Sequence, residues 1–133
     1  MTSELAGRPP RSALVTRLLW GLLIAVVTAV VTVVEAFLVV LRAGTVRAPV
    51  SIVMAVVLHP LLTRWMRDTT ASRPAALIPF AVWVAIVLPL GAPRAEGDLV
   101  LTGEWVSYAY LLIAMASFAL SIGLLLPRRR RGR

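Results

Sequence analysis

The sequence predicts an all-α fold: an integral membrane bundle of four helices with both chain ends in the cytoplasm. Of its 133 residues, 59% are hydrophobic and only 15% are charged, and the mean hydropathy is +0.88. Four apolar stretches approach the length that crosses the hydrocarbon core of a bilayer. All fourteen basic residues are arginines, and they gather beside these stretches. A water-soluble domain of this size could not hide so much apolar surface.

The first transmembrane helix is expected over residues 18–41, after a polar cytoplasmic tail over residues 1–17. At 1.5 Å per residue this helix is roughly 36 Å long, enough to cross a bilayer with some tilt. The apolar run is too long for a secretory signal peptide, so we expect the helix to be retained.

The second and third helices are expected over residues 46–62 and 75–90, both short for a crossing. Pro49 suits the first turn of the second helix, where its missing N–H costs nothing. Pro60 lies near the other end and is expected to kink or thin the last turn. The basic segment between these helices is expected to be an inner loop.

The fourth helix is expected over residues 105–126, and Pro127 ends it. An arginine-rich cytoplasmic tail over residues 127–133 follows. The domain organisation is therefore one four-helix domain, residues 18–126, between two polar tails.

The arginines also predict the orientation of the bundle. With the N-terminus inside, eleven of the fourteen arginines lie in the inner segments and three in the outer ones. Short cytoplasmic loops carry the excess of basic residues in membrane proteins. We therefore expect an N-in/C-in topology.

Glu35 is the acidic residue inside a predicted span, and an ionisable side chain there suggests a functional site. It is either a site that responds to protons or cations, or a carboxyl held inside the bundle by hydrogen bonds or by Arg42. Arg42 is seven residues on and would share its helix face. Ser107, Tyr108 and Tyr110 are expected at a similar depth, although Tyr108 also suits an outer aromatic belt. The candidate intramembrane functional residues are Glu35, Arg42 and Tyr108.

His59 is the single histidine of the chain. It is predicted near the inner end of the second helix, whereas Glu35 is near the outer end of the first. The helical rise separates them by roughly 15–20 Å in depth. We therefore expect His59 to form hydrogen bonds at the inner interface and not to pair with Glu35.

Small residues form stripes on two of the predicted helices. Gly21, Ala25 and Ala29 recur every four residues on the first helix, and Ala119 and Gly123 do so on the fourth. Such stripes permit close approach of helices. They serve either packing within the bundle or docking of a partner membrane protein or a second copy of the chain.

The C-terminal tail contains candidate lipid-binding residues: Arg128, Arg129, Arg130 and Arg131. Basic residues beside a membrane helix attract anionic lipids by about 1 kcal/mol each. The alternative is that they only fix the orientation of the last helix. The sequence offers no folded basic surface with a stacking platform, so we expect no binding of nucleic acid.

The residue inventory excludes several classes of site. The chain has no cysteine and one histidine, which excludes disulfides and argues against thiolate and histidine metal sites. It also lacks a catalytic Ser/His/Asp set at compatible depths and a glycine-rich phosphate loop. We therefore expect no enzymatic activity, no cofactor and no metal.

The segment around the last loop is similar to a known group of proteins. Residues 90–94 read Leu-Gly-Ala-Pro-Arg, and they precede Glu96-Gly97-Asp98, Gly103 and a Tyr-Leu-Leu helix. This pattern resembles an uncharacterised family of small four-helix membrane proteins from actinobacteria. The resemblance implies a bacterial plasma membrane and no known activity.

A second resemblance is to the small multidrug resistance transporters, which are short four-helix chains. They exchange protons for cationic drugs at a carboxylate on their first helix, and Glu35 and Trp83 are similar in placement. Three features depart from that family, and one of them is that the tails of this chain are longer than those of the compact family members. Glu35 is expected nearer the outer end of its helix, and the arginines are too asymmetric for dual topology.

Together, these observations favour a non-enzymatic accessory or structural membrane component. Its small-residue faces would dock a partner, and its inner arginines would hold anionic lipid. The alternative function is a small proton-coupled transporter that uses Glu35.

Overall fold

A computed structural model describes residues 10–39, 42–43, 46–47, 49–92 and 105–125 of the chain. This part of the chain has four helices that are long and apolar enough to cross a membrane, which confirms the all-α prediction and indicates a multi-pass membrane protein. The elements in order are α1 (Arg11–Leu38), β1 (Arg42–Ala43), β2 (Val46–Arg47), α2 (Val50–Thr70), the short 3₁₀ helix η1 (Pro74–Leu77), α3 (Ile78–Gly91) and α4 (Trp105–Leu125).

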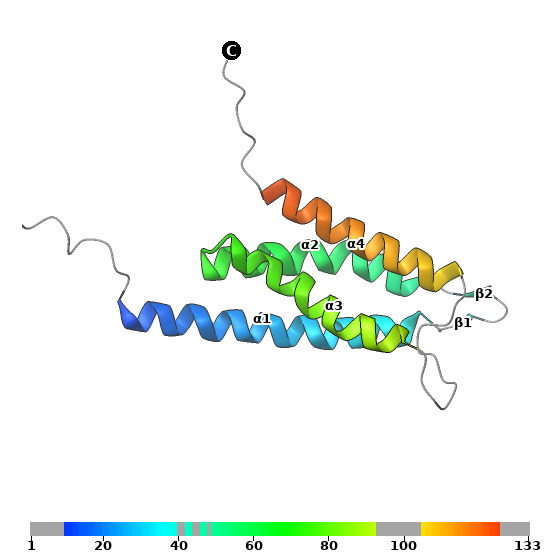
Figure 1. Cartoon of the computed structure of the whole chain (residues 1–133), viewed down its shortest axis with the longest axis horizontal. Helices are drawn as coiled ribbons and strands as arrows, with labels where there is room; N and C mark the ends of the chain where they lie inside the picture. The colour runs from blue at the N-terminus through cyan, green and yellow to red at the C-terminus, as the bar shows by residue number, and fades with distance from the viewer. Residues whose placement is uncertain (1–9, 40–41, 44–45, 48, 93–104, 126–133) are drawn as a thin grey trace, which may run out of the picture.

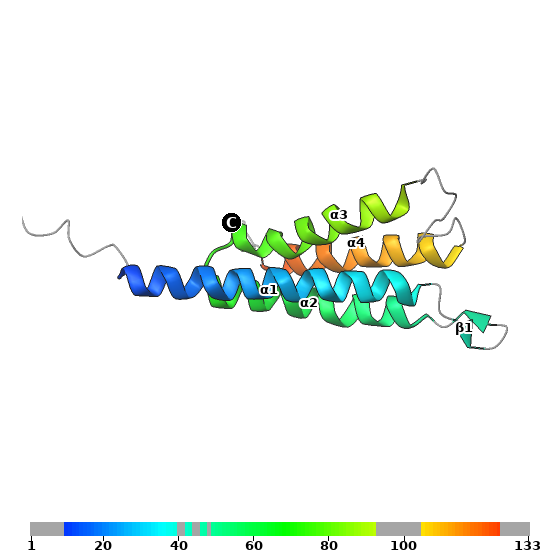
Figure 2. The same cartoon turned by 90° about the horizontal axis from the view of Figure 1, so that it is seen from below.

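The four helices lie side by side along the long axis of the molecule, and each runs opposite to the one before it (Figure 1). Helix α2 is central, because it packs against both α1 and α4, and α3 lies against α1 and α2. Figure 2 shows that α3 leans away from the other helices toward its C-terminal end. The C-terminal end of α2 lies at the end of the bundle where α1 begins (Figure 1).

Helix α1 is longer on its N-terminal side than the sequence suggested. It begins at Arg11, where the carbonyl of Pro10 accepts the N–H groups of Ala13 at 2.9 Å and Leu14 at 3.3 Å. Proline fits before a helix because it has no N–H to leave unsatisfied. The predicted polar tail over residues 1–17 is therefore partly helical, and α1 spans 28 residues, roughly 42 Å.

Helix α2 also differs from its predicted range. It begins at Val50 and continues through Pro60 to Thr70, so most of the predicted inner loop is helix. In apolar surroundings, continuing the helix satisfies the backbone groups on both sides of a proline, which outweighs the one bond it removes. The helix ends at Thr70, and the next residue, Ala71, has a φ of 51° in the left-handed region. By contrast, η1 with α3 and α4 lie close to the expected ranges.

A two-residue antiparallel strand pair connects α1 to α2. Arg42 pairs with Arg47, and Ala43 pairs with Val46. Because α1 ends at Leu38, Arg42 is not on this helix. The expectation that Arg42 shares a helix face with Glu35 is therefore wrong.

The bundle interior contains two apolar clusters. The larger one joins all four helices: Val39, Ala55, Trp83, Val87, Val106, Tyr110, Ala114 and Phe118. The smaller one lies between α1 and α2: Ile24, Leu62 and Met66. Large apolar side chains such as Leu18, Leu112 and Leu120 are exposed on the outward faces. An apolar outer surface on apolar helices suits a lipid environment.

The small-residue stripe of α1 is used for packing within the bundle. A Cβ atom at Gly21 would lie 3.3 Å from Thr70 Cγ2 and 3.9 Å from Met66 Sδ, so α1 and α2 approach closely there. Thr28 and Thr32 are buried on this side of α1, but their hydroxyls bond carbonyls of their own helix at 2.7 and 2.8 Å. The stripe therefore acts through close packing of α1 and not through threonine bonds between helices.

Gly21 of α1 and Gly123 of α4 provide a matched pair of substitutions. Gly21→Leu is expected to lower the free energy of unfolding by about 1–3 kcal/mol, because the side chain must push α2 away. Gly123→Leu is expected to change it by less than about 0.5 kcal/mol, since a Cβ there meets no described atom within 4 Å. Unfolding in mixed detergent micelles measures both values. Equal effects of the two substitutions would contradict this account of the α1–α2 contact.

Candidate functional site

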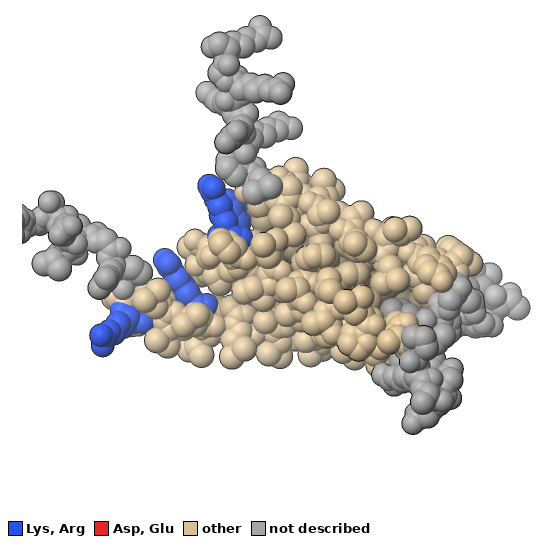
Figure 3. Space-filling model, in the orientation of Figure 1, with Lys and Arg blue, Asp and Glu red and all other residues tan. Residues whose placement is uncertain are grey.

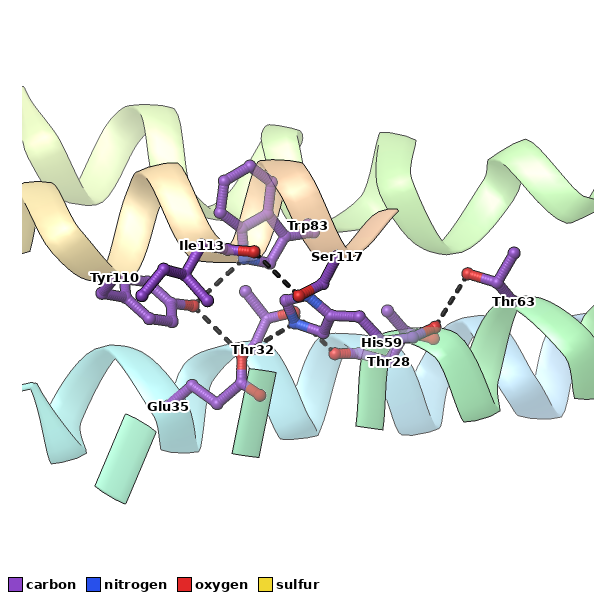
Figure 4. A network of polar contacts seen from close by, with 9 residues as sticks. All are labelled: Thr28, Thr32, Glu35, His59, Thr63, Trp83, Tyr110, Ile113 and Ser117. Carbon is purple, nitrogen blue, oxygen red and sulfur yellow. Dashed lines mark hydrogen bonds and ion pairs between the residues drawn. The ribbon is translucent and has the colours of Figure 1, made fainter. Parts of the chain in front are cut away.

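One side chain from each of the four helices enters a hydrogen-bonded network in the bundle interior (Figure 4). Glu35 Oε2 on α1 lies 3.0 Å from His59 Nε2 on α2. The Tyr110 hydroxyl on α4 donates to the same Oε2 at 3.1 Å. Trp83 Nε1 on α3 donates to the Tyr110 hydroxyl, also at 3.1 Å. All four side chains are at most 3% exposed, so the network lies away from the surface.

The expectation that Glu35 and His59 lie at different depths is wrong. Because α2 continues to Thr70, His59 lies near the middle of its helix and not at the inner end. Side chains on a helix also lean toward the helix N-terminus. On the antiparallel helices α1 and α2, Glu35 and His59 therefore lean toward each other along the bundle axis. Both effects shorten the separation that helical rise alone suggested.

The imidazole of His59 is surrounded by aromatic rings. It stacks on Phe118 with a centroid distance of 4.1 Å and an interplanar angle of 17°. Trp83 meets it edge-on at 6.2 Å, and Phe80 packs against Phe118 at 5.4 Å. These aromatic rings pack around the imidazole from α3 and α4. The rings also fix the orientation of His59 toward Glu35.

The Glu35–His59 pair has hydrogen-bonding capacity that the network does not use. Glu35 Oε1 and His59 Nδ1 are buried and have no hydrogen-bond partner among the described residues. Buried polar atoms are usually paired, so two unpartnered atoms on one contact pair require an explanation. A carboxyl and an imidazole can each gain or lose a proton at such an atom.

The other candidate residues lie outside this network. Tyr108 is 60% exposed, whereas Tyr110 is buried and contacts Glu35. Tyr108 and Tyr110 are two positions apart, and each position turns an α-helix by about 100°. Their side chains therefore point about 200° apart, on opposite sides of α4. Ser107 is buried, but its hydroxyl has no hydrogen-bond partner among the described residues. Arg42 lies in β1, and residues 128–131 are outside the described part of the chain.

Sequence signals for this network exist in the spacing of polar and small residues. Thr28, Thr32 and Glu35 are spaced by four and three residues, which places them on one face of α1. Ala55 and His59 are four residues apart on α2 and share its buried face. These periodicities predict which side chains point inward. They do not predict which helices face each other.

Among the described residues, no group of three or more His, Cys, Asp or Glu side chains could hold a metal ion. Comparison with known protein families, with curated proteins and with solved structures finds no match to this chain.

Proposed function

We propose that this chain is a small proton-coupled carrier of a bacterial plasma membrane, oriented N-in/C-in, in which the Glu35–His59 pair binds and releases the proton. The observation that carries the proposal is the 3.0 Å contact between an acidic and a basic side chain that are both buried. The distribution of arginines supports the orientation. The proposal of a bacterial membrane rests on the resemblance of residues 83–112 to small actinobacterial membrane proteins.

Stability alone is a weak reason for such a pair. Replacing a buried ion pair with apolar residues of similar size is often neutral or stabilising. This bundle also has other means of holding its helices, such as the close α1–α2 contact at Gly21. Ionisable side chains inside membrane proteins instead mark proton and ion sites. Function is therefore the better explanation of Glu35 and His59.

The charge of the pair couples proton binding to helix packing. A carboxylate beside a neutral imidazole has a net charge of −1, and one added proton makes the pair neutral. A net charge in an apolar interior is costly. In the proposed cycle, the closed arrangement of the four helices holds the neutral pair, and a second arrangement that admits water or a cation holds the charged pair. Coupling of proton binding to helix movement requires that two arrangements of the helices bind the proton with different affinities.

Tyr110 and Trp83 extend this coupling to the other two helices. The hydroxyl of Tyr110 donates to Glu35 Oε2, and hydrogen bonds to an ionised carboxylate are about twice as strong as neutral ones. Protonation of Glu35 therefore weakens the link between α1 and α4. Since Trp83 donates to the same hydroxyl, α3 is connected to the change as well.

Glu35→Gln is expected to abolish proton binding by the pair, because glutamine keeps the size of the side chain but does not titrate. Infrared difference spectra of the protein in liposomes, recorded between two pH values, should show a buried carboxyl band in the wild type and none in the variant. Proton flux into the same liposomes should fall more than tenfold. Asp68→Asn is the matched control, since Asp68 is exposed and outside the network.

Two outcomes would contradict the proposal. The first is a carboxyl band that persists in Glu35→Gln and disappears in Asp68→Asn. The second is a proton flux that is the same in the wild type and in Glu35→Gln. His59→Gln is expected to shift the band, because it changes the partner of the carboxyl and keeps the carboxyl itself.

The second candidate function is a non-enzymatic accessory component that docks a partner membrane protein or a second copy. The observation that favours it is the exposed position of Ala119 and Gly123 on α4, in contrast to the stripe of α1, which already packs on α2. In this case the network only holds the bundle together. The substitution Glu35→Gln distinguishes the two candidate functions. An accessory component is expected to keep its docking of a partner or second copy in this variant, whereas a carrier is expected to lose proton flux.

A further inference from the structure

An apolar groove with a basic mouth lies at the end of the bundle where α1 begins and α2 ends. Its volume is about 500 Å³, and its walls include Leu18 and Leu22 of α1 and Ile78 of α3. Arg17 and Ser72 also line it. On the face drawn in Figure 3, the arginines that are coloured lie at this end of the molecule. The groove is therefore apolar along its length and polar where the basic residues gather.

A second, polar cavity of about 360 Å³ adjoins the same turn at the end of α2. It is lined by Arg67, Asp68, Ala71 and Arg73. The turn is sharp because Ala71 adopts a left-handed conformation, which brings the residues after α2 back beside its last turn. The groove and this cavity together form one corner of the bundle. Among its described lining residues, Arg17, Arg67 and Arg73 are basic and Asp68 is acidic. Its charge is complementary to an anion.

We propose that this corner binds one anionic phospholipid from the leaflet on the side of the N-terminus. An acyl chain lies in the groove against Leu18 and Leu22, and the phosphate faces Arg17 and Ser72. The head group extends toward Arg67 and Arg73. Guanidinium groups bind phosphate oxygens through paired N–H donors. Basic pockets between membrane helices bind anionic head groups through this chemistry.

A second groove in the same molecule shows why the charge decides the ligand. It lies between α3 and α4, has a volume of about 420 Å³, and includes Leu77, Phe80 and Ala119 in its walls. Among its described lining residues, none is charged. That groove has no means of distinguishing an anionic lipid from a zwitterionic one. The groove at Arg17 has both the apolar wall and the basic mouth that an anionic phospholipid needs.

The test measures lipid retention by the full-length protein in detergent, using native mass spectrometry. Phosphatidylglycerol is expected to be retained severalfold more than phosphatidylcholine. Arg17→Gln should lower retention of phosphatidylglycerol about fivefold, the equivalent of about 1 kcal/mol for one basic charge, and leave phosphatidylcholine unchanged. Arg11→Gln is the matched control, because Arg11 is an exposed arginine on the same helix that does not line the groove.

Three results would overturn the proposal: equal retention of the two lipids, an equal loss in Arg11→Gln, or displacement of the lipid by millimolar inorganic phosphate. The last result would indicate a site for a free anion. The proposal depends on membrane insertion and not on the proton site, so Glu35→Gln is expected to retain phosphatidylglycerol like the wild type. Failure of the lipid site and failure of the carrier are therefore distinguishable.

Discussion

Replacing His59 with leucine is expected to lower the free energy of unfolding of the bundle by about 3 kcal/mol. The substitution leaves the Glu35 carboxyl fully buried without its imidazole partner, 3.0 Å away in the wild type. This decrease in the free energy of unfolding is at the lower end of the range for a broken buried ion pair, because Tyr110 still donates to Glu35 Oε2. Unfolding in mixed detergent micelles, followed by circular dichroism, measures the effect.

The double variant Glu35→Leu/His59→Leu is expected to be more stable than His59→Leu alone. It removes both ionisable groups and leaves apolar side chains of similar size, which often matches the stability of the buried pair. The difference between the double variant and the sum of the single variants gives the coupling energy of the pair. If the changes in the free energy of unfolding of the two single variants simply add, the coupling energy of Glu35 and His59 is zero. Such a result would also contradict the proposed coupling of proton binding to helix packing.

The class of the protein follows from its sequence for a simple physical reason. A helix that crosses a membrane must satisfy all its backbone hydrogen bonds internally, so length and hydropathy are nearly sufficient to locate it. The four apolar stretches therefore became four helices. The ends were harder to place. Pro60 marks a helix end in water, but in this apolar bundle α2 continues through it to Thr70.

The site could be predicted only in part. Glu35 is evident as the ionisable residue of an apolar helix, but its partner depends on where two helices lie relative to each other. Because the sequence predicts that the second helix ends at residue 62, eight residues before Thr70, His59 is expected at the edge of the bundle and not in its middle. The lean of both side chains toward their helix N-termini added to this error. Helical rise alone therefore predicts the depth of a contact to within the reach of the two side chains.

The choice between Tyr108 and Tyr110 illustrates a different limit. Both are at the depth of Glu35, and depth does not distinguish opposite faces of α4. The face is set by the spacing of Tyr110, Ala114 and Phe118, which are four residues apart and all buried. Helical periodicity thus contains the information that depth lacks. The exposed Tyr108 instead suits the aromatic belt at a membrane interface.

Phe118→Ala is expected to have two effects, since Phe118 separates His59 from the groove between α3 and α4. One face of the ring stacks on His59, and the same residue lines the groove. Removing the ring leaves a cavity and should lower the free energy of unfolding by about 2–3 kcal/mol. It should also open His59 to the groove, so that an apolar histidine reagent such as diethylpyrocarbonate modifies the variant at least tenfold faster than the wild type.

Met115→Ala is the control, because Met115 lines the same groove and is exposed. It is expected to change neither stability by more than about 0.5 kcal/mol nor the reactivity of His59. If Phe118→Ala is destabilised and His59 stays unreactive, the surrounding rings close over the imidazole, and Phe118 contributes packing alone. If His59 becomes reactive, a single aromatic side chain controls access to the proton-binding pair. Movement of α3 relative to α4 would then be enough to expose that pair, because Trp83 and Phe118 contact His59 from these two helices.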